Sequence, residues 1–396
     1  MSTNLPFVPT DILLPREGFE KWACVACDQF TSQAEYWDEA YSIAAGAPSA
    51  LELILPEAYL DAEGDGARIA RINSVMRQYL DAGVFAEYKD ALILVERRLT
   101  DGRTRRGLVG AFALDEYSYQ PHAHTLIRPT EGTVLSRIPP RVEIRRDAPL
   151  ELPHIMIFMD DRRREVIEGI DVSRLVKLYD FELMLGGGHI RGWLLDEAEQ
   201  CRCLGALSAL AGECAGAGDG LLFAVGDGNH SLASAKAAAP IIGTAAAQYA
   251  LAELVNIHDD GIEFEPIYRV VFNADVPALA RELRAAFPAR EGRAVECVSL
   301  GGEFEVFVDG LETDVLQGFI DDYISAHPQV AVDYIHGVDA VRELSRQEGA
   351  MGFIYDGMEK DELFDYVRAH GILPRKTFSV GRACDKRYYL EARRLR

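Results

Sequence analysis

The fold is decided by residues 221–236, which read LLFAVGDGNHSLASAK. The apolar run at 221–225 predicts a buried strand, and the residues after the glycines predict a helix that Pro240 ends. Gly226 and Gly228 let the backbone turn sharply between strand and helix. The N–H groups of a first helical turn point outward at the positive end of the helix dipole, so this turn predicts a phosphate-binding site.

Four polar residues surround the turn: Asp227, Asn229, His230 and Ser231. A tight turn capped by an Asx side chain would have the same spacing, so the spacing alone leaves both interpretations open. The dinucleotide fingerprint GxGxxG and the phosphate loop GxxxxGK[ST] are both missing from the sequence. Neither of those nucleotide-binding motifs therefore explains the turn.

Strands and helices alternate on both sides of this stretch. Residues 69–80 carry apolar side chains at helical spacing up to Gly83, which predicts a helix with a glycine at its C-terminus. Residues 91–114 read as a hairpin around Asp101-Gly102. Alternation of this kind favours a sheet flanked by helices.

The length of 396 residues, 48% of them hydrophobic, suffices for two or three domains with cores of their own. The pattern of elements changes near residue 265. We expect a first domain, 1–265, that carries the TEGT and GDGNHS loops, and a second, 266–396, that ends in the PRKTFS segment. The predicted class is α/β (mixed α+β): a mixed sheet flanked by helices, with a second, smaller α+β unit.

The chain is acidic, with 41 Lys and Arg against 63 Asp and Glu and a net charge of −22. Such a charge repels phosphate backbones and anionic membranes, so we expect neither nucleic acid nor a membrane as partner. The first residues lack the apolar stretch of a signal peptide, and no run is long enough to span a membrane, which favours a cytoplasmic protein. The sequence leaves open whether the chain forms a homo-oligomer. The basic residues gather near the C-terminus, where a local basic site is expected at 375–396.

Seven cysteines at irregular spacing favour free thiols in a reducing compartment over a disulfide framework. Cys24 and Cys27 have the spacing of half a zinc site. Cys201 and Cys203 are too close together for the other half, so no structural zinc is expected.

Two further loops combine cations, hydroxyls and a carboxylate. The first, IRPTEGT at 127–133, is followed by Arg137 and other arginines that could clamp a phosphate or a carboxylate. The second, LPRKTFS at 373–379, places Arg375 and Lys376 beside a proline. Each could also be a solvated surface turn. Three such loops from different parts of a chain are what a phosphate-handling active site collects.

These stretches resemble the domain of unknown function 1015 family, in order and along nearly the whole chain. The resemblance is carried by ACDQFTSQ at 26–33, IRPTEGTVLSRIPPR at 127–141, VGDGNHSLASAK at 225–236, Pro266–Arg269 and PRKTFSVGRACDKRYYLEAR at 374–393. In many relatives the GDGNHS turn reads Asp-Gly-His-His-Arg, a signature shared with the ParB and sulfiredoxin-like nucleotide-binding fold. Some members of that fold phosphorylate free L-serine, so the resemblance implies a phosphate-binding turn.

Asp227, Gly228 and His230 match that signature. Asn229 replaces the His that is common in the relatives, and Ser231 replaces the common Arg. The positive charge of the missing Arg would then come from elsewhere. The candidates for that charge are Lys236, Arg375 and Lys376.

The TEGT loop is similar to a His-Glu-x-Thr pattern of the relatives, in which Glu131 and Thr133 match and Thr130 replaces the His. The resulting hypothesis is a kinase that uses Mg²⁺ with ATP or ADP and phosphorylates a free hydroxy amino acid, L-serine first. Glu131 is expected as general base, Asp227 as the Mg²⁺ ligand and His230 as a third catalytic residue. The nucleotide is expected on Gly226, Gly228, Asn229, Ser231, Lys236, Arg375 and Lys376, and the substrate on Arg128, Thr130, Thr133 and Arg137.

Two other functions stay open at this point. One is a nucleotide-binding regulatory protein of the ParB-like type without substantial catalysis, which Ser231 in place of Arg favours. The other is a metal-dependent hydrolase built on His124, Asp227 and His230.

Overall fold

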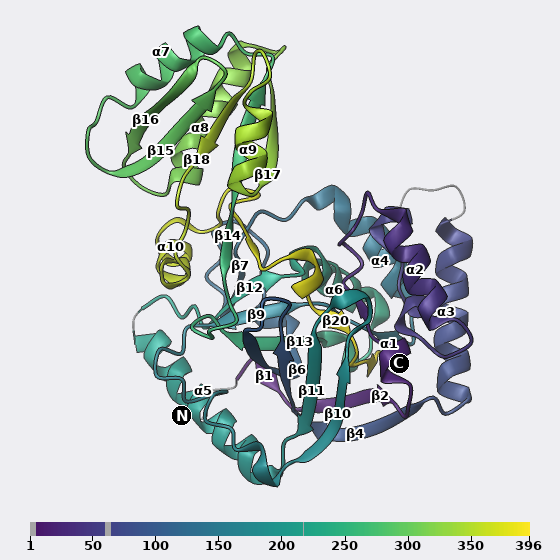
Figure 1. The fold of residues 1–396 in the computed structure, drawn as a ribbon. Coiled ribbons are helices and arrows are strands. Elements are labelled where there is room, and N and C mark those ends of the chain that lie inside the picture. The colour runs from purple at the N-terminus through teal and green to yellow at the C-terminus, as the bar shows by residue number, and fades with distance from the viewer. Residues whose placement is uncertain (1–4, 60–64, 217) are drawn as a thin grey trace. The chain divides into compact units, whose positions relative to one another are not determined.

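The computed structural model describes residues 5–59, 65–216 and 218–396. The chain divides into two compact units (Figure 1). Unit 1 consists of Met1–Ile262 together with Arg382–Arg396, and unit 2 of Glu263–Gly381. The division expected from sequence kept the chain after residue 265 in one domain. The structure instead returns the last segment to unit 1, because this segment pairs with strands there.

Unit 1 is built on a nine-stranded mixed sheet in the order β10-β11-β5-β6-β13-β9-β12-β7, with β1 paired to β6. Its strands are β1 (Phe7–Val8), β5 (Ile93–Arg98), β6 (Thr104–Ala113), β7 (Ile127–Pro129), β9 (Met156–Met159), β10 (Val176–Glu182), β11 (His189–Leu194), β12 (Phe223–Asp227) and β13 (Tyr249–Asn256). Strands β9 and β13 are buried along almost their whole length, as expected for a sheet covered on both faces. The predicted α/β class is confirmed.

The helices of unit 1 are α1 (Phe19–Trp22), α2 (Ala34–Ala44), α3 (Asp65–Asp81), α4 (Ile138–Arg146), α5 (Glu197–Gly216) and α6 (Asn229–Ile242). Helix α3 confirms the helix predicted at 69–80, and Gly83, with φ 67°, turns the chain after it. The predicted hairpin is confirmed by the antiparallel pairing of β5 with β6. Helices α4 and α6 pack against each other beside the sheet.

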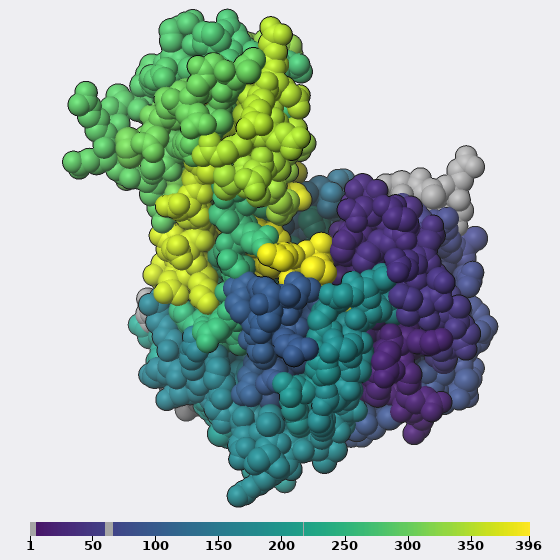
Figure 2. All heavy atoms as spheres, in the orientation of Figure 1, coloured from purple at the N-terminus to yellow at the C-terminus, as the bar shows by residue number. Residues whose placement is uncertain are grey.

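The C-terminal segment of unit 1 lies against segments from the start and middle of the chain. Strand β20 (Tyr388–Tyr389) pairs with β3 (Cys24–Val25), and β21 (Arg393–Arg394) pairs with β8 (Leu150–Glu151). Figure 2 shows bright yellow atoms of this segment beside the purple atoms of the N-terminal residues. The remaining short pair joins β2 (Thr10–Pro15) to β4 (Phe85–Ala91).

Buried ion pairs anchor this segment. Arg387 pairs with Glu253 and Glu391, and Arg393 with Glu151, and all of these side chains are almost completely buried. The sequence predicted a local basic site at 375–396. For these two arginines that prediction is wrong, because each is neutralised inside the protein by a glutamate from a distant strand, and Arg387 also by Glu391 of the same segment.

Unit 2 is an α+β unit with a six-stranded sheet in the order β16-β15-β18-β14-β17, with β19 paired to β14. Its strands are β14 (Phe264–Phe272), β15 (Arg293–Ser299), β16 (Gly302–Val308), β17 (Ala331–His336), β18 (Met351–Ile354) and β19 (Phe378–Val380). Its helices are α7 (Val276–Ala286), α8 (Glu312–Ala326), α9 (Val338–Leu344) and α10 (Leu363–His370). Asp275 caps α7 by accepting a 3.0 Å hydrogen bond from Ala278 N–H. No helix in the described part of either unit is both long and apolar enough to cross a membrane.

Candidate functional site

Two of the loops that the sequence singled out meet at one edge of the large sheet. Strands β7 and β12 run parallel and are paired, so the TEGT loop after β7 and the GDGNHS turn at the end of β12 emerge side by side. Thr130 Oγ1 donates to the Val225 carbonyl at 2.8 Å, and Val134 N–H donates to His230 Nε2 at 3.1 Å. The carboxyl ends of parallel strands are where α/β sheets bind their ligands.

Both glycines of the turn are required by its packing. A Cβ on Gly226 would overlap the ring of Phe158 in β9. Gly228 has φ +74°, and a Cβ there would lie 3.0 Å from Ile155 Cα. Gly228 is the N-cap of α6, and no side chain in the described structure caps this helix. The first N–H groups of α6 are therefore available to an anion.

His230 is held as a neutral imidazole. Burial, followed by the positive charges of Arg141 and Arg137, lowers the pKa of His230 to about 4. Because Nε2 accepts the Val134 N–H, the proton of the neutral ring lies on Nδ1. The same shift indicates that both guanidinium groups lie near the turn.

A second histidine, His154, faces the turn from the segment before β9. Its Nδ1 lies 2.7 Å from Tyr389 Oη, which also accepts the Cys27 N–H at 3.2 Å. The Tyr389 hydroxyl therefore donates to Nδ1, and the ring proton of His154 lies on Nε2. This Nε2 is 3.4 Å from Ser231 Oγ and 3.7 Å from the Asp28 carboxylate. His154 is thus a donor toward the turn and not a base for Ser231.

Lys386 supplies a cation at the same place. Its Nζ lies 3.6 Å from Asp227 Oδ2, and both side chains are mostly buried. Asp227 Oδ1 accepts the Gly228 N–H at 2.8 Å. Burial alone would raise the pKa of Asp28. His154, Gln29 and Lys386 stabilise its carboxylate by more than burial disfavours it, so the pKa of this group lies below its usual range. Lys386 therefore supplies positive charge at this turn.

Three of the predicted site residues form hydrogen bonds that stabilise the fold of unit 1. Arg128 is buried and donates to the Thr125 carbonyl at 2.9 Å and to Asp219 at 2.7 Å. Lys236 Nζ donates to the Leu114 and Tyr117 carbonyls. Thr130 is buried and bonded to β12 as described above. Neither cation enters the function proposed below.

The other predicted residues of unit 1 lie along the two loops. Glu131 and Thr133 are half-buried in the loop after β7, and Arg137 is exposed at the start of α4. Burial raises the pKa of Tyr117 above its usual range, and the Thr133 hydroxyl beside it lowers that pKa in part. Asn229 is buried, and its Oδ1 has no partner among the described residues.

Arg375 and Lys376 lie in unit 2, in an exposed turn before β19. Lys376 has φ 61°, in the left-handed region. The buried Arg269 donates to the carbonyls of Lys376 at 2.8 Å and Arg375 at 3.2 Å, and Thr377 Oγ1 donates to the Pro374 carbonyl at 2.7 Å. The backbone of this turn is thus fixed from within unit 2, while its two cations point into solvent.

Among the described residues, no arrangement of side chains supports the metal or the reactive-thiol hypothesis. His124 is exposed in the loop before β7. Within residues 5–59, 65–216 and 218–396, no group of three or more His, Cys, Asp or Glu side chains comes close enough to hold a metal ion. Burial raises the pKa of Cys27 to about 12 and that of Cys24 well above its usual range, so both thiols stay protonated near neutral pH.

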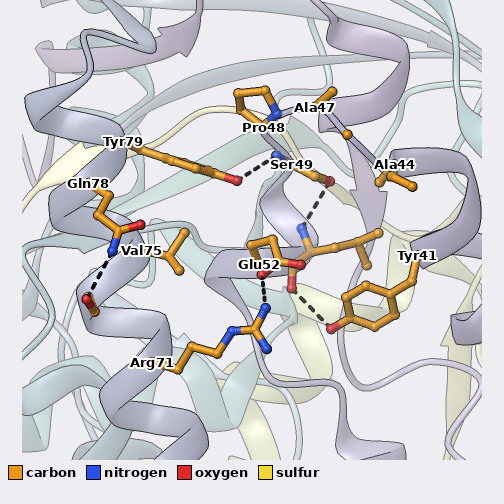
Figure 3. Close-up of a pocket in the computed structure, with 14 residues that line it drawn as sticks. Tyr41, Ala44, Ala47, Pro48, Ser49, Glu52, Arg71, Val75, Gln78 and Tyr79 are labelled. Atoms are coloured by element: carbon orange, nitrogen blue, oxygen red, sulfur yellow. Dashed lines mark hydrogen bonds and ion pairs between the residues drawn. The ribbon is translucent and has the colours of Figure 1, made fainter.

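A pocket of about 630 Å³ lies away from this edge, between α2, the loop after it and α3 (Figure 3). Its polar groups bond to one another. Tyr79 Oη accepts the Ser49 N–H at 3.2 Å, and Arg71 pairs with Glu52 at 2.8 Å. The pocket therefore offers a ligand few unmet hydrogen-bonding groups.

Sequence reasoning missed Asp28, His154, Lys386 and Tyr389. Three of them lie in the stretches 26–33 and 374–393, which carry the family resemblance, and that resemblance is the signal that could have found them. His154 stands before a buried strand with no local pattern around it. These four residues meet only because β20 pairs with β3 across most of the chain length.

The chain was compared with known proteins. The family model described as Protein of unknown function (DUF1015) matches residues 8–363. No curated protein matches the chain. Among solved structures, free serine kinase in complex with AMP is 13% identical, with 71% of this chain and 90% of that chain covered and a TM-score of 0.39.

A conserved hypothetical protein from Pyrococcus furiosus is 12% identical, with 72% of this chain and 94% of that chain covered and a TM-score of 0.35. SbnI from Staphylococcus aureus, truncated at its C-terminus, is 11% identical, with coverages of 69% and 82% and a TM-score of 0.37. The match over 8–363 shows that the chain belongs to the DUF1015 family of proteins of unknown function.

Proposed function

We propose that this protein is a Mg²⁺-dependent phosphotransferase of the ParB and sulfiredoxin-like type. It binds ATP or ADP at the N-terminus of α6 and phosphorylates a free hydroxy amino acid, with L-serine as the first candidate. The observation that carries the proposal is the meeting of the TEGT loop and the GDGNHS turn at the carboxyl ends of β7 and β12, in front of an uncapped helix. Phosphoryl transfer needs positioned donors and charge more than covalent help.

The donors for the phosphates come from several segments. The N–H groups of Asn229, His230 and Ser231 open α6, His154 directs its Nε2 proton toward Ser231, and Lys386 adds a positive charge beside Asp227. Such a set stabilises a phosphate because backbone N–H groups, an imidazole donor and an ammonium act together in a mostly buried place. Arg137 and Arg141 add positive charge around His230.

Glu131 is the proposed general base. It follows Thr130, whose side chain is bonded to β12, so this residue lies in the loop at the edge where the phosphates are proposed to bind. A carboxylate near the acceptor hydroxyl orients it and accepts its proton as the new bond forms. Asn229 and Thr133 are proposed to contact the nucleotide and the acceptor.

Asp227 is the proposed Mg²⁺ ligand. Mg²⁺ is commonly held by one or two carboxylates together with the phosphates of its nucleotide, so a single aspartate at a phosphate-binding turn fits this ion. The bound ion would supply neutralisation of the phosphate charge. Lys386, at 3.6 Å from Asp227, orients this carboxylate.

Calorimetric titration of the full chain with Mg²⁺-ADP and Mg²⁺-ATP tests the proposal, with Gly228→Ala and Gly243→Ala as a matched pair. Both glycines have a left-handed φ, +74° at the N-cap of α6 and +73° at its C-cap, so the two variants are matched in backbone strain, although only Gly228→Ala also places a Cβ 3.0 Å from Ile155 Cα. We expect Gly228→Ala to lose at least tenfold in nucleotide affinity and Gly243→Ala to retain it, whereas equal losses would place the phosphates elsewhere.

An assay for ADP release in the presence of L-serine tests the transfer itself. Turnover that depends on the acceptor supports the proposal. Nucleotide binding without turnover on any hydroxy amino acid would contradict the kinase and favour the regulatory alternative, for which Ser231 in place of Arg argues. Duplex DNA should not bind, because the net charge is −22, and a sub-micromolar affinity at physiological salt would contradict that expectation.

A further inference from the structure

A cavity of about 140 Å³ lies within unit 1 beside the first turn of α6. Ser231, His154 and Tyr389 line one part of it, and these are the residues that face the proposed phosphate site. Most of the remaining wall is apolar and includes Leu53, Leu55, Met76, Ile144, Leu150 and Leu152. The cavity is therefore polar toward α6 and mostly aliphatic elsewhere, with the charged side chains of Glu57, Arg141, Arg145 and Glu151 also in its wall.

The volume limits what this cavity can hold. An apolar cavity of about 150 Å³ in another protein is filled by one benzene molecule, so the space here suits roughly six to eight non-hydrogen atoms. An adenine base with its ribose is far larger. The cavity is thus sized for a small molecule and not for the nucleotide.

One donor in the wall of the cavity lacks a hydrogen-bond acceptor among the described residues. Arg141 pairs with Glu57, while Glu151 pairs with both Arg145 and Arg393. Arg393 does not line the cavity, so the two lining arginines are balanced by the two lining glutamates. Arg145 lines the cavity, and its Nε is a buried donor with no partner in the part of the chain that the structure describes. A buried donor without an acceptor is unfavourable, and a ligand carboxylate would relieve this cost.

We infer that this cavity binds the acceptor of the proposed transfer, and that the acceptor is a small aliphatic hydroxy acid with a larger carbon body than serine. Its carboxylate accepts from Arg145, its carbon chain packs on the leucine and isoleucine side chains, and its hydroxyl lies toward Ser231. The inference rests on the proposed function. In the transfer from ATP, the hydroxyl oxygen bonds to the terminal phosphorus, the bond from that phosphorus to the bridging oxygen breaks, ADP leaves with the electron pair, and the hydroxyl proton passes to Glu131.

The inference is tested by calorimetric titration of the full chain, with and without Mg²⁺-ADP, with 3-hydroxybutyrate, L-threonine, L-serine and glycerol. Each further buried methyl group is expected to tighten binding about fourfold, so L-threonine should bind more tightly than L-serine, and 3-hydroxybutyrate should bind. Glycerol, which has no carboxylate, should bind at least tenfold more weakly. Binding of L-serine as tight as that of L-threonine, or of glycerol as tight as that of the acids, would overturn the inference.

Two variants locate the site. Leu152→Phe places a larger side chain in the partly exposed wall of the cavity, and Leu204→Phe makes the same change in α5, where the residue packs on the core outside the cavity. We expect acid binding to fall at least tenfold in the first variant only. Arg145→Lys keeps the charge beside Glu151 but removes the Nε donor, and it should weaken the acid and leave its methyl ester unchanged.

The outcomes separate this inference from the function it rests on. Titrations of the acids without nucleotide report on the cavity alone, so acid binding that Leu152→Phe removes supports the inference even where the nucleotide does not bind. Turnover of L-serine that Leu152→Phe leaves unchanged would overturn the inference and leave the kinase standing. Equal losses in Leu152→Phe and Leu204→Phe would also overturn it.

Discussion

The GDGNHS turn of unit 1 and the PRKTFS turn of unit 2 look alike in sequence but are built differently. Both are short, polar and fixed by glycine or proline, and both were predicted to bind phosphate. In the first, the side chains of His154 and Lys386 come from distant segments and face the turn. In the second, the buried Arg269 donates hydrogen bonds to backbone carbonyls of the turn, and the side chains of Arg375 and Lys376 are exposed.

The difference teaches that local composition does not distinguish a site from a supported surface turn. What distinguishes them is the direction in which the buried polar groups point. At the GDGNHS turn, His154 Nε2 lies 3.4 Å from Ser231 Oγ and Lys386 Nζ lies 3.6 Å from Asp227 Oδ2, so both groups face the turn where we propose that phosphate binds. At the PRKTFS turn, the buried guanidinium of Arg269 has its donors filled by Ile267, Gln317, Tyr355 and the turn itself.

The largest expected effect is on catalysis at the first turn. Glu131→Gln keeps the size of the side chain but cannot accept a proton, so turnover should fall by roughly 10²–10⁴ while nucleotide affinity stays within about twofold. Glu143→Gln, an exposed change in α4 near the same loop, is the matched control and should keep wild-type turnover. Wild-type turnover in Glu131→Gln, measured as ADP release, would remove Glu131 from the mechanism.

A large effect on stability is expected at the second turn. Arg269→Met leaves the carbonyls of Arg375 and Lys376 without their buried donor and Ile267 with the Tyr355 hydroxyl alone, so unit 2 should lose roughly 3 kcal/mol or more of stability. Arg281→Met, at an exposed position of α7, should change stability by less than about 0.5 kcal/mol. Hydrogen exchange of the β14 and β17 amides measures the stability of unit 2 in both variants. Unchanged protection in Arg269→Met would show that the turn does not depend on this residue.

A smaller effect is expected for Lys376, which the sequence predicts to contact the nucleotide. A cation that acts when charge spreads over the transferring group lowers the barrier more than it strengthens binding, so Lys376→Ala should reduce turnover several-fold with little change in nucleotide affinity. Initial rates and calorimetry measure the two quantities. If both stay within about twofold of wild type, Lys376 and the PRKTFS turn have no part in the chemistry.

The smallest effect concerns pH and His230. Burial and the two nearby arginines lower the pKa of His230 from its ordinary value of 6.5 to about 4. Between these values the unfolded chain binds a proton that the folded chain does not, so stability falls as pH decreases from about 6.5 to about 4. His230→Asn should flatten this part of the profile, measured as urea midpoints at about pH 5 and about pH 7. The same pH dependence in both proteins would contradict a buried neutral His230.

The strand and helix of 221–236 and the hairpin at 91–114 could be predicted because their signals are local. Apolar runs, glycine turns and helical spacing act over a few residues, and the structure confirms both elements. The meeting of the TEGT and GDGNHS loops was expected from their shared polar composition and from the resemblance, but not from any local signal. It depends on the parallel pairing of β7 with β12, which no local pattern encodes.

The C-terminal arginines show why the rest could not be predicted. Arg387 and Arg375 stand in the same basic stretch, yet Arg387 is buried between Glu253 and Glu391 and Arg375 is exposed. A sequence window counts both as positive charge. Which arginine is neutralised depends on a glutamate from β13, and that partner is set by the path of the chain through the whole sheet.

The central claim is that phosphate binds at the N-terminus of α6, and the backbone amide signals of Asn229, His230 and Ser231 report on it directly. In a titration of the isotope-labelled full chain with Mg²⁺-ADP, followed by nuclear magnetic resonance, we expect these three signals to shift most and the signal of Gly243, at the other end of the helix, to stay in place. Binding of Mg²⁺-ADP that leaves these three signals unmoved while others shift would contradict the account.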